Sequence, residues 1–263
     1  VPEVAIQAQQ FGDTHFFEIK DLVDKTGAYI AKKLGTEGAV VVNSASAGIA
    51  EAVAGIIGQG SKYHAYHPFS PRFTKREIIL PKGQNVDYGT PEEVMIELGG
   101  GQVVEAGYAN MCTPEHIEMM ITEQTAAIFY VKSHHAVQKS MLTIPEALEV
   151  AHKHDLPLIL DAAAEEDLKK YVDLGVDVVL FSGAKAIEGP ASGLVFGKEP
   201  YIGWTKLQSL GIGRAMKIGK ENILGFTTAL IHYLDNGPES GDAMKARLHP
   251  FVAALNEVPH LNV

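Results

Sequence analysis

Three short segments of the chain place reactive or anion-binding groups directly after predicted buried strands. Residues 43–48, Asn-Ser-Ala-Ser-Ala-Gly, are a run of small residues that opens a predicted helix. Asp161 ends an apolar strand and is followed by three alanines, and Lys185 lies on the glycine-rich turn beyond Phe181. Because ligands of open α/β sheets bind beyond the carboxyl ends of the strands, we expect these segments to meet at one edge of the sheet.

Each segment also has an ordinary structural explanation. Small residues make a tight turn between a strand and a helix, aspartate is a favoured helix cap, and a loop lysine is usually solvated. Taken together, the segments match the parts of one cofactor, pyridoxal 5'-phosphate (PLP). The small-residue turn would bind a phosphate, Asp161 would face a ring nitrogen, and the amine of Lys185 would form a Schiff base with an aldehyde. The sequence therefore predicts a PLP site.

Alternating apolar runs and capped amphipathic segments predict the elements that hold this site. Strands are predicted at 39–42, 77–80, 102–105, 126–131, 157–160 and 177–181, with a return strand at 193–197. Helices are predicted to begin after Thr90, Thr113 and Thr143, where a capping hydroxyl precedes a first-turn proline and an acid. This order of elements predicts an α/β fold with a mostly parallel sheet and helices on both faces.

Three regions are expected along the chain. An N-terminal helical segment covers 1–36, and its apolar residues predict a packed helix over 16–34. Residues 37–235 form the predicted cofactor-binding large domain. Residues 236–263 are predicted to form a helix after the break at Asn-Gly-Pro, leading toward a small C-terminal domain before which the chain is truncated. The last three residues could begin a further strand.

Composition limits the classes of partner and of chemistry. The 263-residue chain is 46% hydrophobic and 21% charged, as in globular proteins, and no apolar run is long enough to cross a membrane. The first ten residues lack a secretory signal, so we expect a cytoplasmic protein. A net charge of −10 disfavours a nucleic-acid partner. Cys112 is the single cysteine, and His64 and His67 lack a third ligand, so neither a disulfide nor a metal site is expected.

The segment 181–197, Phe-Ser-Gly-Ala-Lys-Ala-Ile-Glu-Gly-Pro-Ala-Ser-Gly-Leu-Val-Phe-Gly, resembles the lysine loop of fold type I PLP enzymes. The similarity is to the branch related to bacterial selenocysteine synthase (L-seryl-tRNA selenium transferase). Within that branch, residues 85–101 and 132–141 resemble the D-glucosaminate-6-phosphate ammonia-lyases. The resemblance covers most of the chain, as far as the helix near Leu234. It implies a PLP-dependent transferase-like fold, with Lys185 bound to the cofactor and Ser182 bound to its phosphate.

The residue pattern and the resemblance together predict the residues of the site. The predicted catalytic residues are Lys185, Asp161 and His135. The predicted cofactor-binding residues are Ser44, Ala45, Ser46, Gln84, Asn85, Ser133, Asp161, Ala163, Ser182 and Lys185. The predicted substrate-binding residues are His134, Arg214, Lys217 and Arg72. Structural roles remain open for several of these residues, since Gln84 and Asn85 could be turn residues and the cations could lie on solvated faces.

The resemblance implies a PLP-dependent lyase that removes water and ammonia from an amino-sugar acid phosphate and yields a 2-keto-3-deoxy acid phosphate. In this reaction the freed amine of Lys185 removes the α-proton, while Asp161 keeps the ring nitrogen protonated. The implied partner is a small phosphorylated amino acid or amino-sugar acid. The implied assembly is a homodimer or higher homo-oligomer, with the site at a subunit interface.

The sequence leaves several alternatives open. A transferase of the selenocysteine synthase type acts on a charged tRNA, which the acidic net charge disfavours. A PLP aldolase or racemase uses the same scaffold, and the sequence does not determine which substrate bond is aligned for cleavage. A nucleotide-sugar or NAD-binding enzyme is disfavoured because no G-x-G-x-x-G follows the first strand. A non-catalytic binding module is disfavoured by the presence of both Asp161 and Lys185.

Overall fold

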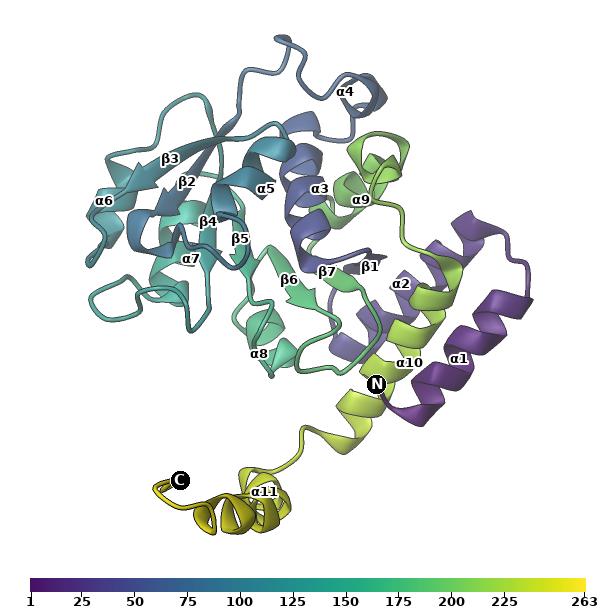
Figure 1. The fold of residues 1–263 in the computed structure, drawn as a ribbon. Coiled ribbons are helices and arrows are strands. Elements are labelled where there is room, and N and C mark those ends of the chain that lie inside the picture. The colour runs from purple at the N-terminus through teal and green to yellow at the C-terminus, as the bar shows by residue number, and fades with distance from the viewer.

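Seven strands form one sheet in the computed structural model, which describes all of residues 1–263 (Figure 1). The strands are β1 (Gly38–Val42), β2 (Glu77–Pro81), β3 (Gln102–Ala106), β4 (Thr125–Val131), β5 (Leu158–Asp161), β6 (Val178–Ser182) and β7 (Gly193–Gly197). Their order in the sheet is β1-β7-β6-β5-β4-β2-β3. Strands β2 to β6 pair in parallel, whereas β7 runs antiparallel to β1 and β6. The predicted mostly parallel sheet is therefore confirmed.

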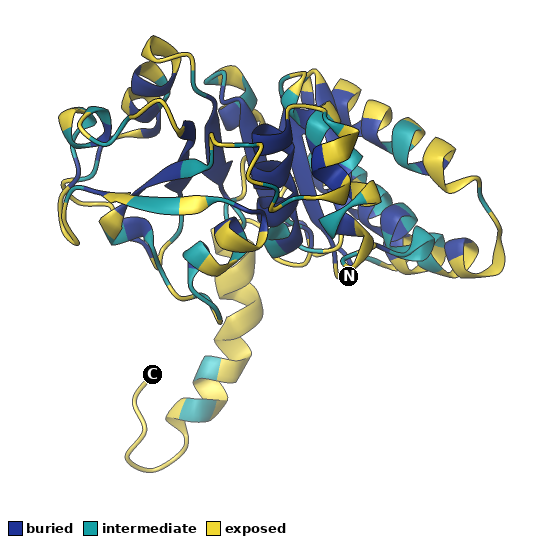
Figure 2. Cartoon of the chain, turned by 90° about the horizontal axis from the view of Figure 1, so that it is seen from above, coloured by how far each residue is buried: buried dark blue, intermediate teal, exposed yellow.

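Helices cover both faces of the sheet, and the buried strands lie between them (Figure 2). The helices are α1 (Glu3–Thr14), α2 (Ile19–Leu34), α3 (Ala45–Gly58), α4 (Lys62–Tyr66), α5 (Glu92–Leu98), α6 (Pro114–Glu118), α7 (Ile144–Lys153), α8 (Leu168–Asp173), α9 (Tyr201–Leu207), α10 (Lys220–Asn236) and α11 (Gly241–Asn256), with the 3-10 helices η1 (Lys82–Gln84), η2 (Gln208–Leu210) and η3 (Ile212–Arg214). Apolar residues of α3, α5 and α9 pack on one face, and those of α2, α7, α8 and α10 on the other. None of these helices combines the length and the apolar character that crossing a bilayer requires.

The burial of β3 and β4 matches their positions in the sheet. Every residue of β4 is buried, as expected for a continuous apolar run covered on both faces. β3 forms one edge of the sheet, and four of its five residues are exposed or only partly buried. β1 forms the other edge and is nevertheless buried along its whole length. The parallel strands β4, β5 and β6 lie between these edges and end on the same side of the sheet.

Two of the three predicted helix starts are confirmed. Thr143 forms a reciprocal capping box with Glu146, whose Oε2 accepts the N–H of Thr143 at 2.6 Å. Thr113 forms the same arrangement with the ring of His116. The predicted cap at Thr90 is wrong, because α5 begins at Glu92 and its cap position is Pro91.

The two ends of the chain differ from the sequence prediction. The helix predicted over 16–34 begins only at Ile19, and α1 precedes it as a separate helix. α1 lies beside α10, where a Cβ at Gly12 would come within 2.6 Å of the Cα of Glu221 (Figure 1). At the other end α11 has no buried residue and projects from the body, and the last three residues form no strand. The predicted break between the last two helices is confirmed.

Asp177 connects three elements at the amino end of β6, and its side chain is only 5% exposed. Its carboxylate accepts the N–H of Leu158 at 2.9 Å and the ammonium of Lys198 at 2.9 Å, and it lies 2.9 Å from Nε2 of His152. Asp177→Ala should lower the free energy of unfolding by about 2–3 kcal/mol, because it leaves the buried N–H of Leu158 without an acceptor. Urea unfolding measures this change.

The exposed Asp173 at the end of α8 provides a matched control. Asp173→Ala should change the free energy of unfolding by no more than about 0.5 kcal/mol. Equal effects of the two substitutions would contradict the role assigned to Asp177.

Candidate active site

One cavity at the carboxyl edge of the sheet contains most of the residues that the sequence predicts for catalysis and cofactor binding. Its volume is about 180 Å³. It is lined by Ser44, Ala45, Ser46, Ile49, Val86, Tyr88, Glu92, Lys132, Ser133, His135, Asp161, Ala163, Ala164, Ser182 and Lys185. These residues follow β1, β4, β5 and β6 or lie near the start of α5, so the parallel strands bring together segments that are distant in sequence.

The small-residue turn after β1 forms the start of α3. Ser44 caps this helix, and its Oγ accepts the N–H of Ala47 at 3.0 Å. The N–H groups of Ala45 and Ser46 lie in the first turn, where the helix itself supplies no acceptor. Such a helix start attracts anions through free N–H groups and the helix dipole. This part of the cavity therefore fits a phosphate.

Gly193 holds the small-residue turn against the sheet. A Cβ at this position would lie 2.4 Å from the carbonyl carbon of Ser44, closer than any side chain could approach. In the sheet register Gly193 is opposite Val42 on one side and Ser182 on the other. One glycine thus lies between the strand that leads into the phosphate turn and the strand that leads into the lysine loop.

Two carboxyl groups are buried side by side in the cavity. Asp161, the last residue of β5, is 7% exposed, and its Oδ1 accepts the N–H of Ala163 at 2.9 Å. Glu92, the first residue of α5, is 1% exposed, and its Oε2 has no hydrogen-bond partner. Burial raises the pKa of both groups, and it raises that of Glu92 to about 9. With a pKa of about 9, Glu92 keeps its proton at neutral pH, so it can donate a hydrogen bond within the cavity.

Backbone hydrogen bonds hold the loop that carries Lys185. The N–H of Ser182 donates to the carbonyl of Ala163 at 3.2 Å, which ties the loop to the segment after Asp161. The N–H of Gly183 donates to the carbonyl of Ser192 at 2.9 Å, and that of Glu188 donates to the carbonyl of Lys185 at 2.9 Å. The amine of Lys185 therefore projects from an ordered turn into the cavity that also contains Asp161.

Of the two histidines after β4, only His135 lines the cavity. The ring of His134 packs against that of His135, with 4.0 Å between the ring centroids, and its side chain lies outside the cavity. Ser133 lines the cavity and accepts the N–H of His135 through its Oγ at 3.2 Å. The segment thus presents a hydroxyl and an imidazole to a bound ligand.

The structure does not bring Gln84 and Asn85 to the cavity. The Oε1 of Gln84 accepts the N–H of Val131 at 2.8 Å inside the core, and the amide of Asn85 donates to Glu93 and Glu105. The turn η1 after β2 directs both side chains away from the site. The side chains that reach the cavity from this part of the chain are Val86, Tyr88 and Glu92. The sequence does not predict any of these three as a site residue.

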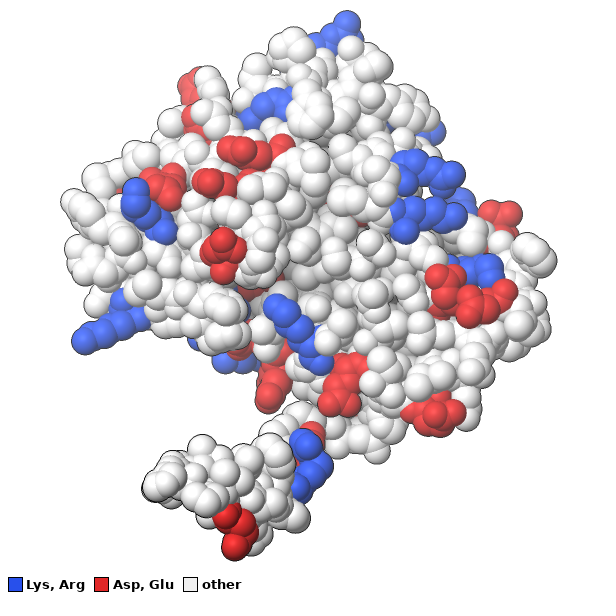
Figure 3. Space-filling view, in the orientation of Figure 1, with Lys and Arg blue, Asp and Glu red and all other residues white.

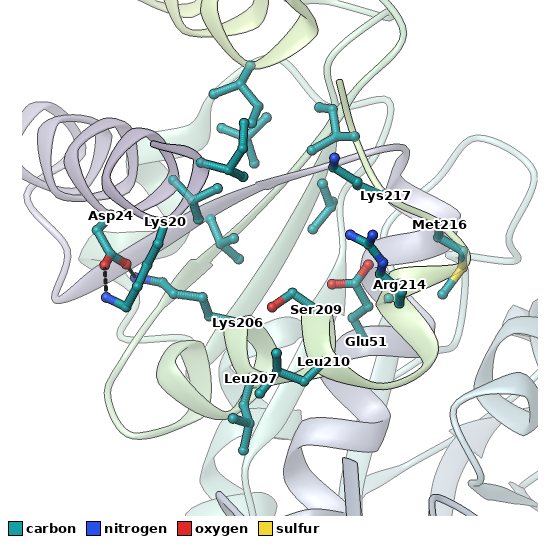
Figure 4. Close-up of a pocket in the computed structure, with 18 of the residues that line it drawn as sticks. Lys20, Asp24, Glu51, Lys206, Leu207, Ser209, Leu210, Arg214, Met216 and Lys217 are labelled. Carbon is teal, nitrogen blue, oxygen red and sulfur yellow. Dashed lines mark hydrogen bonds and ion pairs between the residues drawn. The ribbon is translucent and has the colours of Figure 1, made fainter. Parts of the chain in front are cut away.

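Arg214 and Lys217 line a different cavity of about 510 Å³ between α2, β1, α9 and the start of α10 (Figure 4). The two cavities share no lining residue. Figure 4 shows Arg214 beside Glu51, whose pKa burial raises to about 8. Arg72 lies outside both cavities, with its guanidinium 4.6 Å from the ring centre of Tyr63. The predicted substrate cations are therefore separated from Lys185 in this chain.

The chain is similar to known proteins over most of its length. The family model of L-seryl-tRNA selenium transferase matches residues 69–249. A D-glucosaminate-6-phosphate ammonia lyase from Salmonella typhimurium is 45% identical over 98% of this chain and 69% of that protein. A 5'-C-glycyluridine monooxygenase-decarboxylase from Streptomyces is 34% identical over 95% of this chain and 64% of that protein. The chain thus spans about two thirds of the length of these relatives.

A solved structure of a D-glucosaminate-6-phosphate ammonia-lyase superposes with a TM-score of 0.92 at 43% sequence identity. The match covers 98% of this chain and 69% of that chain. It confirms the fold class and the resemblance inferred from the lysine loop.

Gly193→Ala tests whether the small-residue turn is the phosphate site. The added Cβ would push the Ser44–Ala45 peptide out of place, and overpacking of this kind costs about 1–3 kcal/mol. We expect the Kd for PLP, measured by absorbance titration, to rise about tenfold or more. A Cβ at Gly241 meets no atom within 4 Å, so Gly241→Ala should leave the Kd unchanged. An unchanged Kd for both variants would contradict this assignment.

Proposed function

The chain belongs to the L-seryl-tRNA selenium transferase family, and we propose that it is a PLP-dependent ammonia-lyase acting on an amino-sugar acid phosphate. The observation that carries the proposal is the position of Asp161, Lys185 and the turn Ser44–Ser46 around one cavity. Among reactions possible on this scaffold, the similarity to the Salmonella lyase supports removal of ammonia from a substrate of the D-glucosaminate 6-phosphate type.

The residues of the cavity fit PLP part by part. The first turn of α3 and the hydroxyl of Ser182 would hold the phosphate, and Asp161 would accept a hydrogen bond from the protonated ring nitrogen. Lys185 would bind the aldehyde carbon through its Nζ. When bound, PLP supplies an electron sink for negative charge at the substrate α-carbon.

Lys185 and His135 are the cavity residues that would transfer protons. With substrate bound, the free amine of Lys185 would remove the proton from the α-carbon. His135 lines the same cavity and would protonate the departing hydroxyl of the neighbouring carbon, so that the C–O bond breaks and water leaves. Loss of water leaves an enamine. Once it is released, its hydrolysis would yield the keto acid and ammonia. Lys132, also in the lining, would supply a cation for an acidic substrate.

A small-molecule substrate fits the charge distribution better than a tRNA does. The net charge is −10, and basic side chains on the face shown in Figure 3 occur in small groups among acidic ones. Binding to a nucleic-acid backbone draws on clustered Lys and Arg. The charge therefore supports a lyase with a small phosphorylated substrate.

We also propose that the protein is a cytoplasmic homo-oligomer. Exposed aromatic side chains on α1, α4 and the loops that follow them support an interface between copies, among them Phe11, Phe16, Tyr66 and Phe69. The single cysteine, Cys112, is buried and free, as is usual in reducing compartments.

Lys185→Ala tests the proposed function directly. Borohydride treatment of the wild-type chain with PLP should fix the cofactor on the peptide that contains Lys185, as measured by mass spectrometry. The variant should retain no cofactor, and its release of keto acid from D-glucosaminate 6-phosphate should fall at least ~100-fold, because it lacks the general base. Lys169, exposed on α8, provides the control, and Lys169→Ala should behave as the wild type. Covalent labelling of the Lys185→Ala variant would contradict the proposal.

A further inference from the structure

Glu92 has a chemical environment that a purely structural role does not explain. It begins α5, yet its side chain turns inward, is almost fully buried and lines the cofactor cavity. No N–H or O–H group of another residue donates a hydrogen bond to its Oε2. A first-turn glutamate normally stays in solvent near the helix start, so burial of this side chain needs another cause.

Asp161 is the group beside which Glu92 is buried. Both side chains line the same cavity of about 180 Å³. Asp161 raises the pKa of Glu92, whereas Glu92 lowers the pKa of Asp161, so the proton resides on Glu92. The other oxygen contact of Asp161 is the N–H of Ala163, which can only donate. Two ionised carboxylates buried in one small cavity would repel each other strongly. A proton between them removes the repulsion.

The remaining charged and titratable groups at the cavity come from three other elements. Lys185 faces the pair from the loop after β6, and its positive charge opposes the protonation of both acids. Tyr88 lies on the segment before α5, where its hydroxyl donates to Ser46 at 3.2 Å. Lys132 and His135 follow β4. Lys185 is the cation with a direct effect on the pair, and cofactor binding would engage its amine.

We propose that Glu92 and Asp161 share one proton, carried by Glu92, so that the pair presents a single negative charge to the ring nitrogen of the cofactor. This inference rests on the PLP site proposed above. One protonated ring nitrogen balances one carboxylate, whereas a second buried negative charge would have no partner. Glu92 is thus a positioning residue that acts through Asp161, because its O–H orients the carboxylate that contacts the ring.

The proton held by Glu92 makes stability depend on pH in a defined direction. The unfolded carboxyl titrates near 4.5 and the folded one near 9. Between these values the folded chain holds one proton that the unfolded chain has lost. The unfolding equilibrium constant of the wild type should therefore rise with pH, by up to about tenfold per pH unit from this group alone.

Glu92→Gln removes the titrating group and keeps a neutral donor to Asp161. We would measure urea unfolding of the full chain without cofactor, for wild type and variant, from about pH 5 to pH 9, the window that the two pKa values set. The ratio of the wild-type to the variant unfolding constant should increase steadily with pH. Glu93→Gln is the matched control, because Glu93 is the next residue of α5 and lies outside the cavity, bonded to Asn85. A ratio independent of pH for Glu92→Gln would overturn the proposal.

Infrared spectroscopy near neutral pH provides a second measurement that does not depend on unfolding. Glu51 is also protonated near neutral pH, because burial raises its pKa to about 8, so all chains carry the substitution Glu51→Gln. In this background, the chain with Glu92 intact and its Glu93→Gln variant should show the carbonyl stretch of a protonated carboxylic acid, and the Glu92→Gln variant should lack it. The same band should persist after PLP is bound, because Glu92 keeps its proton beside the ring. A band that survives in the Glu92→Gln variant of the Glu51→Gln chain would place the proton elsewhere and overturn the assignment.

The two proposals fail in different ways. If PLP binds and is fixed on Lys185, but the acid band is absent from the Glu51→Gln chain, the shared proton is wrong and the lyase proposal stands. If the band and the pH dependence are present but PLP does not bind, the proposed function and the role of the pair toward the ring nitrogen both fail.

Discussion

Burial of a carboxylate at the carboxyl end of β5 is the constraint on which the rest of the site depends. A carboxylate removed from water is unstable unless hydrogen bonds or a cation compensate it. Asp161 has the N–H of Ala163, a neighbouring acid that carries a proton and the charge of Lys185. Each of these partners comes from a different segment, and together they leave the site suited to a cationic ring nitrogen. The same partners define the volume in which the ring would lie.

The sheet brings these partners together through one antiparallel strand. β7 lies between β1 and β6, and its first residue, Gly193, is in register with Val42 and with Ser182. The phosphate turn after β1 and the lysine loop after β6 are therefore held at a fixed separation. Backbone hydrogen bonds from Ser182 and Gly183 then tie the lysine loop to the segments after β5 and before β7. A small number of main-chain contacts thus positions both ends of a flat, phosphorylated cofactor.

Much of this arrangement could be predicted from the sequence, because buried strands and the small residues after them have a strong local signal. The sequence predicts all seven strands. It also predicts that three segments meet at one site, namely Asp161, Lys185 and the turn Ser44–Ser46. Glu92 was missed because an acid after a proline is typical of a solvated helix start, and its inward direction depends on tertiary packing. The sequence predicts Gln84 beside the cofactor ring because it does not reveal the turn η1. In the structure this turn directs the Gln84 side chain into the core. The separation of Arg214 from Lys185 likewise depends on how α9 and η3 fold back over α3.

The most direct test of the central claim is a crystal structure of the chain grown with PLP. We predict continuous electron density from Nζ of Lys185 to the cofactor, with the phosphate at the N–H groups of Ala45 and Ser46 and the ring nitrogen at Asp161. Density for the cofactor in the cavity lined by Arg214 and Lys217, or a ring nitrogen away from Asp161, would contradict the account.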